Sequence, residues 1–368
     1  MQVLSFPTTD APENAAYNRN MAKRRTERER PAQGRRLVDQ LRGAELAVRE
    51  VNARGGVLGR QVKIYRADDR GDKAKAAATA RRVVARGIHF VVGPYNSSVG
   101  LVALPIYRTN GVLPVWNTSR DATAGSGVTV QPMNSQIAPV ESRYVLRGAP
   151  RRVAMLVDDT PNGAFTAGMA ARLAKALRAK GVIVTRISLV ESANPDGSRA
   201  VPDSYYADRV AEALALAPDL IYVSTYFPEG ALVARALAAA PATTRCLMGL
   251  ANPDPGFIAA TTLVEAQRCV FSGVAPTPTL KAAWGYVRRY RTTFNKQPGT
   301  WGVYYYDSMR ILFAAITRAG SERYGPVNRA LRATRNFPGA TGPITIDTSP
   351  VGFVVFDRVL LTVHPTDC

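Results

Sequence analysis

Small polar side chains cluster directly after an apolar run at Phe90–Val92. The turn that follows contains Tyr95, Asn96, Ser97 and Ser98, and a helical pattern begins there. Free N–H groups at a helix N-terminus, together with hydroxyls, form a site for a carboxylate or another hydrogen-bond acceptor. The same residues would also serve as a plain serine N-cap. The local sequence therefore leaves a binding site and a simple cap both open.

A second polar turn follows the apolar run Leu113–Trp116. Its residues are Asn117, Thr118, Ser119, Arg120 and Asp121. In open α/β sheets ligands bind outside the carboxyl ends of the strands, so we expect both turns to face one cleft. Arg120 and Asp121 would either contact a polar ligand there or turn outward to solvent.

Catalytic and metal-binding signatures are absent from the sequence. It contains no GxSxG, HExxH or GxxxxGK[ST] stretch, and His89 and His364 are its only histidines. The three cysteines form no CxxC pair, which argues against a zinc site. We predict a protein that is not an enzyme and that needs neither a metal nor a cofactor.

Two cysteines stand at the starts of predicted strands. Cys246 and Cys269 could form a disulfide if the two strands are neighbours, or they could be two small buried thiols. The third, Cys368, is the last residue, and we expect it to be free.

Strand and helix patterns alternate along the chain in two series. The first includes strands at Val62–Arg66, Phe90–Val92 and Leu113–Trp116, and the second opens at Val153–Val157. Such alternation predicts parallel sheets covered on both faces. We therefore expect an α/β protein with two doubly wound parallel-sheet lobes. We assign residues 1–132 and 276–322 to lobe 1, and residues 133–275 and 323–368 to lobe 2.

The chain is strongly basic, with a net charge of +20 from 48 Lys and Arg against 28 Asp and Glu. Much of this charge lies in Arg19–Arg36, where no aromatic residues alternate with the arginines. The segment is either a contact patch for acidic lipid, cell wall or nucleic acid, or a solvated insertion. We expect no nucleic-acid partner, because single-strand binding usually adds aromatic stacking.

Several stretches, taken in order, resemble the type I periplasmic binding proteins, in particular the leucine/isoleucine/valine-type solute receptors of ABC transporters. They are GAELAVREVNARGGVLGRQVKIYRADDRGD at 43–72, VVGPYNSSVG at 91–100, LPVWNTS at 113–119, VDDTPNG at 157–163, DLIYVSTYFPEG at 219–230 and GATGPITID at 339–347. The resemblance implies two lobes joined by a three-strand hinge, which close on a small polar ligand such as an amino acid or an amide. It also implies an ABC permease as partner, a monomeric state and an extracytoplasmic location.

The resemblance also assigns roles to individual positions. Ser97 matches a serine that holds a ligand carboxylate, Tyr226 matches an aromatic residue that packs over the ligand, and Asn162 replaces a tyrosine of the cleft. The glutamate that pairs with a ligand ammonium falls at Ala251 or Asn252, so this counter-charge is missing. Asp254 or Asp121 could substitute for it.

A disulfide of the family is also replaced. The positions that match its two cysteines are Gly71 and Asn96, so both members are absent together.

A second function and the location of the protein also remain open. The same fold serves ligand-sensing domains of signalling or regulatory proteins, and no signal peptide is visible at the N-terminus. The chain is therefore either cytoplasmic or given without its targeting segment.

No apolar run reaches about 18 residues, so we expect no membrane-spanning helix.

Overall fold

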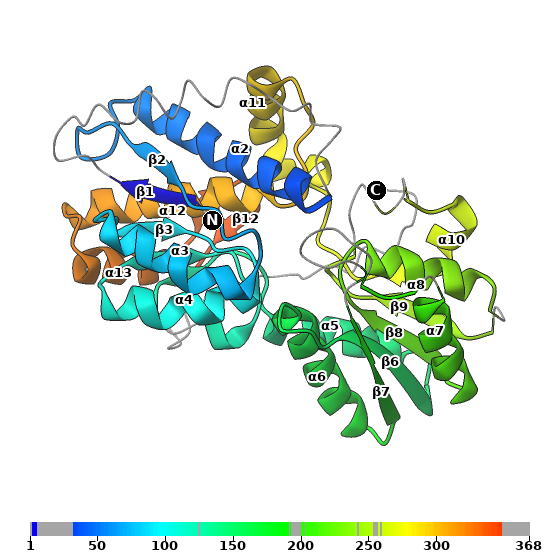
Figure 1. Ribbon diagram of the computed structural model, residues 1–368. Helices are drawn as coiled ribbons and strands as arrows, with labels where there is room; N and C mark the ends of the chain where they lie inside the picture. Colours follow the sequence, from blue (N-terminus) through cyan, green and yellow to red (C-terminus); the bar gives the residue numbers. More distant parts are fainter. Residues whose placement is uncertain are drawn as a thin grey trace.

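The chain folds into two α/β lobes (Figure 1). This computed structural model describes residues 2–5 and 32–347, apart from 124–125, 191, 193–199, 203, 241–242, 253–256 and 258–259. Most of the Arg19–Arg36 segment lies outside the described residues. Its last five residues form the start of the first long helix, which begins at Ala32.

Lobe 1 contains a five-stranded sheet in the order β2-β1-β3-β4-β5. The strands are β1 (Gln2–Ser5), β2 (Lys63–Arg66), β3 (Phe90–Val92), β4 (Leu113–Trp116) and β5 (Val128–Thr129). Strand β1 runs antiparallel to both β2 and β3. The alternating pattern had predicted a fully parallel sheet, and β1 is the exception. The pairs β3–β4 and β4–β5 are parallel.

Lobe 2 contains a second five-stranded sheet, in the order β10-β9-β8-β6-β7, and every pair in it is parallel. The strands are β6 (Arg152–Asp158), β7 (Ile183–Leu189), β8 (Leu220–Ser224), β9 (Arg245–Met248) and β10 (Val270–Phe271). Each helical crossover in this region returns to the same sheet. The sequence therefore shows one uninterrupted series of strand–helix units.

Helices cover both faces of each sheet (Figure 1). In lobe 1 they are α2 (Ala32–Asn52), α3 (Lys73–Ala85), α4 (Ser97–Thr109), α11 (Trp284–Phe294), α12 (Gly302–Ala319) and α13 (Tyr324–Arg332). In lobe 2 they are α5 (Asn134–Leu146), α6 (Ala164–Arg178), α7 (Tyr205–Ala215), α8 (Glu229–Ala238) and α10 (Leu263–Gln267). This architecture confirms the predicted fold class.

Alternation of side chains along the strands divides the core of each lobe in two. In β3, Phe90 and Val92 pack with α2 and α12, whereas Val91 packs with α3 and α4. In β6, Ala154 and Leu156 pack with α7 and α8, and the intervening residues pack with α5 and α6. Strands buried on both faces are typical of doubly wound sheets, and they explain the nearly continuous apolar runs.

The C-terminal part of the described chain packs on lobe 1, although we had assigned residues 323–368 to lobe 2. Helix α13 and the hairpin of β11 (Phe337–Gly339) and β12 (Gly342–Ile344) join the core around α12. The buried Asp307 of α12 accepts hydrogen bonds from the backbone N–H groups of Ala340 (2.9 Å) and Thr341 (2.8 Å). These bonds hold the hairpin on lobe 1 as far as Asp347.

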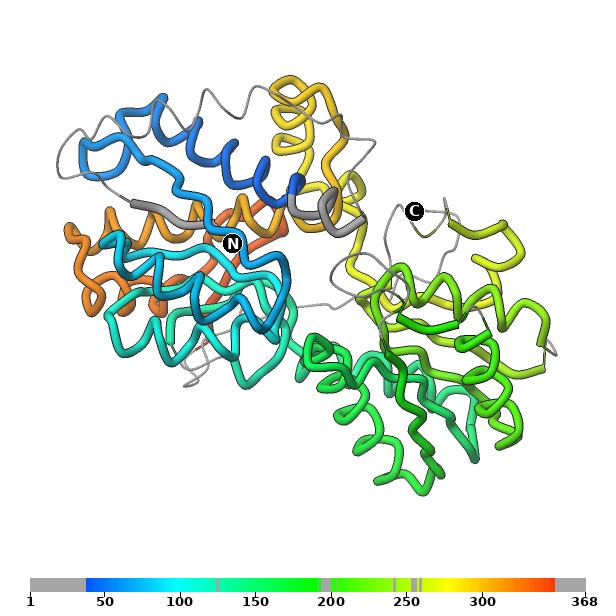
Figure 2. Tube along the Cα trace, viewed as in Figure 1, coloured from blue at the N-terminus to red at the C-terminus, as the bar shows by residue number. Residues whose placement is uncertain are grey.

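The chain crosses between the lobes after β5 and again after β10 (Figure 2). The hinge that the resemblance implies has three strands, and its third crossing would lie beyond the described residues.

A disulfide joins Cys246 of β9 to Cys269, just before β10, with Cα atoms 4.6 Å apart. Strands β9 and β10 are parallel neighbours, so the first of the two alternatives for these cysteines is the observed one.

No helix in the part of the chain that the structure describes is long and apolar enough to cross a membrane. The described residues also hold no cluster of three or more His, Cys, Asp or Glu side chains that could bind a metal ion.

Candidate ligand-binding site

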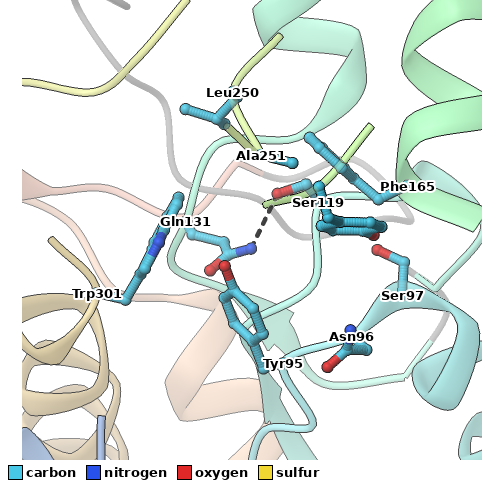
Figure 3. Close-up of a pocket in the computed structure, with 10 residues that line it drawn as sticks. Tyr95, Asn96, Ser97, Ser119, Gln131, Phe165, Leu250, Ala251 and Trp301 are labelled. Atoms are coloured by element: carbon cyan, nitrogen blue, oxygen red, sulfur yellow. Dashed lines mark hydrogen bonds between the residues drawn. The ribbon is translucent and has the colours of Figure 1, made fainter. Parts of the chain in front are cut away.

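A pocket opens between the lobes at the carboxyl ends of the strands (Figure 3). It contains about 350 Å³ of empty space, part of which is open to solvent. Lobe 1 contributes Tyr95, Asn96, Ser97, Ser119, Gln131 and Trp301, and lobe 2 contributes Phe165, Tyr226, Leu250 and Ala251.

The polar side of the pocket begins at the N-terminus of α4. The N-cap Asn96 makes no side-chain bond to the helix, so the first N–H groups of α4 are not capped by it. The buried Ser97 hydroxyl accepts a hydrogen bond from the backbone N–H of Arg120 (3.2 Å). Because its oxygen accepts there, its hydrogen can be donated to a group in the cleft.

Ser119 and Gln131 complete this polar side. The Gln131 side-chain N–H donates to the Ser119 hydroxyl at 2.9 Å, the bond drawn in Figure 3. Gln131 is only 3% exposed, and its amide oxygen has no hydrogen-bond partner. Burying an amide oxygen without a hydrogen-bond partner costs free energy. This side chain is therefore suited to a ligand that supplies a hydrogen-bond partner.

Aromatic rings form the walls. Tyr95 packs edge-on against Trp301, with ring centroids 5.8 Å apart, on the lobe 1 side. On the lobe 2 side, the ring centroids of Phe165 and Tyr226 are 6.4 Å apart. Two aromatic pairs from opposite lobes can enclose the apolar body of a ligand when the lobes close.

Trp301 is positioned by a buried carboxylate on α2. Asp39 accepts hydrogen bonds from the backbone N–H groups of Gly299 (2.9 Å) and Gly302 (2.6 Å), on either side of Trp301, and from the hydroxyl of Tyr290 (2.9 Å). Burial raises the pKa of the Asp39 carboxyl, and these three donors oppose the shift.

Five of the predicted site residues line the pocket: Tyr95, Asn96, Ser97, Ser119 and Tyr226. Three others lie behind it, in the core of lobe 1. Asn117 accepts a bond from the hydroxyl of Ser308 (3.3 Å), Thr118 lies 2.5 Å from the Thr123 hydroxyl, and Ser98 is fully buried. Ser97 and Ser119 line the pocket, and these three neighbours do not.

Two predicted residues join the lobes at the rim and not at the pocket. Asp121 forms an ion pair with Arg172 of α6, with Nε and Oδ2 2.6 Å apart, and also accepts from the backbone N–H of Ser135. The Asn162 side-chain oxygen accepts from the backbone N–H of Lys73, at the start of α3, at 3.2 Å. We call these two contacts the rim contacts.

Asn252 points away from the pocket. Its side chain donates to the backbone oxygen of Gly249 (3.2 Å), and its own oxygen lies so close to Gly230 of α8 that a Cβ there would be only 1.7 Å away. Ala251, the other candidate for the missing glutamate position, does line the pocket. Asp254 lies outside the described residues.

The pocket lining that the structure describes is therefore neutral. Its only titratable groups are the phenols of Tyr95 and Tyr226. Asp121, one of the two proposed substitutes for the missing glutamate, is engaged by Arg172.

Four lining residues were not predicted: Gln131, Phe165, Leu250 and Trp301. Leu250 lies two residues beyond the end of β9, so the rule that ligands bind beyond the carboxyl ends of strands was enough to find it. Gln131 follows β5, a two-residue strand too short to recognise. Trp301 precedes α12, and nothing local in the sequence distinguishes it from a core residue.

The resemblance correctly places Gly71 beside Asn96. Gly71 has a positive φ of 68°, and a Cβ built on it would lie 3.2 Å from the Asn96 side-chain oxygen. The two loops are adjacent here without a covalent link.

Comparison with known proteins agrees with this geometry. The family model described as "Periplasmic binding protein" matches residues 37–354. The Leu/Ile/Val-binding protein BraC3 of Rhizobium johnstonii is 30% identical over 311 residues, covering 82% of this chain and 81% of that protein.

Two solved structures show the same fold. The leucine-binding protein LivK of Thermotoga maritima superposes with a TM-score of 0.75 at 23% identity, over 87% of this chain and 89% of that one. A solute-binding protein of R. palustris in complex with benzoate superposes with a TM-score of 0.66 at 19% identity, over 85% of each chain.

The fold and the cleft define a two-lobed solute-binding protein of the type I kind. The chain belongs to the periplasmic binding protein family. Its relatives are substrate-binding proteins of ABC transporters, and the chain is a binding protein and not an enzyme.

Proposed function

We propose that this chain captures a small carboxylate-bearing solute outside the cytoplasmic membrane and delivers it to an ABC permease. The observation that carries this proposal is the polar corner formed by Ser97, Ser119 and the uncapped N-terminus of α4. A carboxylate is stabilised at a helix N-terminus by hydrogen bonds and by the helix dipole. The names of relatives that bind leucine, isoleucine and valine, or benzoate, support a carboxylate ligand.

In the proposed cycle, lobe 1 binds the carboxylate first and lobe 2 then closes over it. The ligand favours the closed form only through contacts that the open form lacks, and Phe165, Tyr226 and Leu250 supply such contacts from lobe 2. The closed surface of both lobes is then what a permease recognises.

The extracytoplasmic location is supported by the disulfide between Cys246 and Cys269. Disulfides persist in oxidising compartments and are rare where glutathione keeps thiols reduced.

A ligand screen tests the proposal. Carboxylic acids and their neutral amides are added to the purified protein, and thermal stability and small-angle scattering are recorded. A ligand at 100 times its Kd should stabilise the protein by about 2.7 kcal/mol and reduce its radius of gyration at the mass of a monomer. Binding without compaction would contradict the closure step, and neutral amides binding as well as acids would contradict the carboxylate site.

A further inference from the structure

The pocket treats the two ends of an amino acid unequally. For a carboxylate it offers the uncapped start of α4, which is 13 residues long, and the hydroxyls of Ser97 and Ser119. For an ammonium, the described lining offers no negative charge. Ala251, which lines the pocket at one of the two positions where the family's glutamate would fall, carries no charge.

Gln131 provides a second, independent sign that a ligand belongs here. Its amide is 97% buried, it lines the pocket, and its oxygen is without a partner. In the present orientation Ser119 accepts from Gln131 and keeps its own hydrogen for a carboxylate. If the amide rotates by 180°, Ser119 donates to the Gln131 oxygen, and the Gln131 N–H groups face the carboxylate in its place. In the present orientation the oxygen is a single neutral acceptor, whereas an ammonium carries three N–H donors and a full charge.

Two carboxylates near the cleft in the described part of the chain, Asp121 and Asp39, have partners outside the pocket. Asp121 pairs with Arg172 and accepts from the backbone of Ser135. Asp39 lies behind Trp301 and is held by Gly299, Gly302 and Tyr290. Neither of them lines the pocket.

The walls define the rest of the ligand. Tyr95 and Trp301 on lobe 1 face Phe165, Leu250 and Ala251 on lobe 2 (Figure 3). Aromatic faces on both sides bury a flat or branched apolar group well and offer little to a polar one.

We propose that this cleft selects an apolar monocarboxylate without an α-ammonium group, with an aromatic acid as the best-fitting class. This inference rests on the proposed function, because it takes the same site and names its substrate class. Burying the ammonium of an amino acid without a counter-charge costs free energy that the deaminated acid does not lose.

Matched pairs of ligands provide the test. Binding of 3-phenylpropanoate is compared by calorimetry with that of phenylalanine, 4-methylpentanoate with leucine, and benzoate with benzamide. We expect each deaminated acid to bind at least about 10-fold tighter than its amino acid, and benzoate to bind tighter than benzamide.

A gain of function makes the test sharper. Ala251→Glu places a carboxylate at a position that matches the family's glutamate, and Ala251→Gln adds the same bulk without the charge. The Glu variant should improve the affinity for phenylalanine or leucine by at least about 10-fold relative to the Gln variant, and should weaken that for the deaminated acid.

The outcomes separate the two proposals. If wild-type protein binds the amino acids more tightly, and Ser97→Ala weakens them, the substrate class is overturned while solute binding stands. If no acid of either series shifts the melting of the folded protein, both the substrate class and the carboxylate site are overturned.

Discussion

The two walls of the cleft differ in chemistry. In the described lining of the pocket, lobe 1 supplies the hydroxyls and side-chain amides, apart from the phenol of Tyr226, and lobe 2 supplies mostly apolar surface. The polar wall is held by bonds within lobe 1, such as Arg120 to Ser97 and Gln131 to Ser119. In the proposed cycle, this difference means that lobe 1 determines what is recognised, and lobe 2 contributes burial once the lobes close.

The division has an energetic basis. Hydrogen-bonding groups must be in place before a ligand arrives, because each one left unpaired in the closed state costs about 1–3 kcal/mol. Apolar walls have no such directional requirement and contribute about 25 cal/mol for each Å² buried. Lobe 2 can therefore move as a body without losing the specificity of the site.

The largest expected difference between the lobes is in their response to pH, through Glu141 of α5. The carboxyl is fully buried in lobe 2 and accepts a hydrogen bond from Tyr222 of β8 at 2.9 Å. Burial raises its pKa to about 7, although hydrogen bonds from Ser272 and Tyr222 oppose the shift. Because the folded state keeps the proton longer than the unfolded state, stability is complete below about pH 4.5 and falls as pH rises toward 7.

We expect Glu141 to make the protein about 3 kcal/mol less stable at pH 8 than at pH 4.5, apart from other groups. Glu141→Gln should remove this part of the slope. Urea unfolding of both proteins at pH 5 and pH 8 measures it. Parallel pH profiles of the two proteins would show that Glu141 does not titrate in this range.

On the polar wall, Ser97→Ala should weaken binding of a carboxylate by about 1.5–3 kcal/mol, because it removes a hydrogen bond to a charged group. Ser98→Ala is the matched control, since Ser98 is equally buried but does not line the pocket. Calorimetric titration should find the loss in the first variant only. Equal losses in both would indicate a general disturbance of α4.

On the apolar wall, Tyr226→Ala should cost about 1–2 kcal/mol of binding free energy and act mainly on the dissociation rate, because lobe 2 closes after the ligand is bound. Tyr226→Phe keeps the ring and should bind nearly as well as the native protein. Stopped-flow measurement of association and dissociation separates these effects. A loss confined to the association rate would contradict the order of binding.

The smallest effect is expected at the rim contacts. Arg172 is 45% exposed and Asp121 20% exposed, so their ion pair should contribute only about 0.2–1 kcal/mol to closure. Arg172→Ala should weaken ligand binding by that amount, and added salt should abolish the difference between variant and native protein. A larger loss that salt does not change would mean that Arg172 acts inside the cleft.

The sequence was sufficient for the fold because strands and helices differ in period and length. Phe90–Val92 and Leu113–Trp116 have the predicted bounds. It was not sufficient for the direction of β1 or for the lobe of residues 323–347, since pairing direction and long-range packing leave no local pattern. Helix α5 was also missed, because Pro139 interrupts its pattern.

The sequence predicts a site residue correctly only where the residue lies beyond a strand and its side chain faces the cleft. Ser97, Ser119 and Tyr226 lie in the turns beyond β3, β4 and β8 or at the helix start that follows, and all three line the pocket. Asn117, Thr118 and Asn252 also follow strands but point into the core. Side chains in an irregular turn do not alternate regularly, so the sequence does not indicate which of them face the cleft. Gln131 and Trp301 come from short or distant segments that only the folded chain brings together.

The disulfide between Cys246 and Cys269 gives the two lobes different responses to a reductant. It closes a loop within lobe 2, and in the chain-entropy view a loop of this size stabilises the folded state by about 3 kcal/mol. Reduction therefore lowers the resistance of lobe 2 to heat and leaves the contacts within lobe 1 as they are. A scanning calorimetry trace that is one peak in the oxidised protein should separate, after reduction, into an early transition for lobe 2 and a later one for the lobe that carries Ser97.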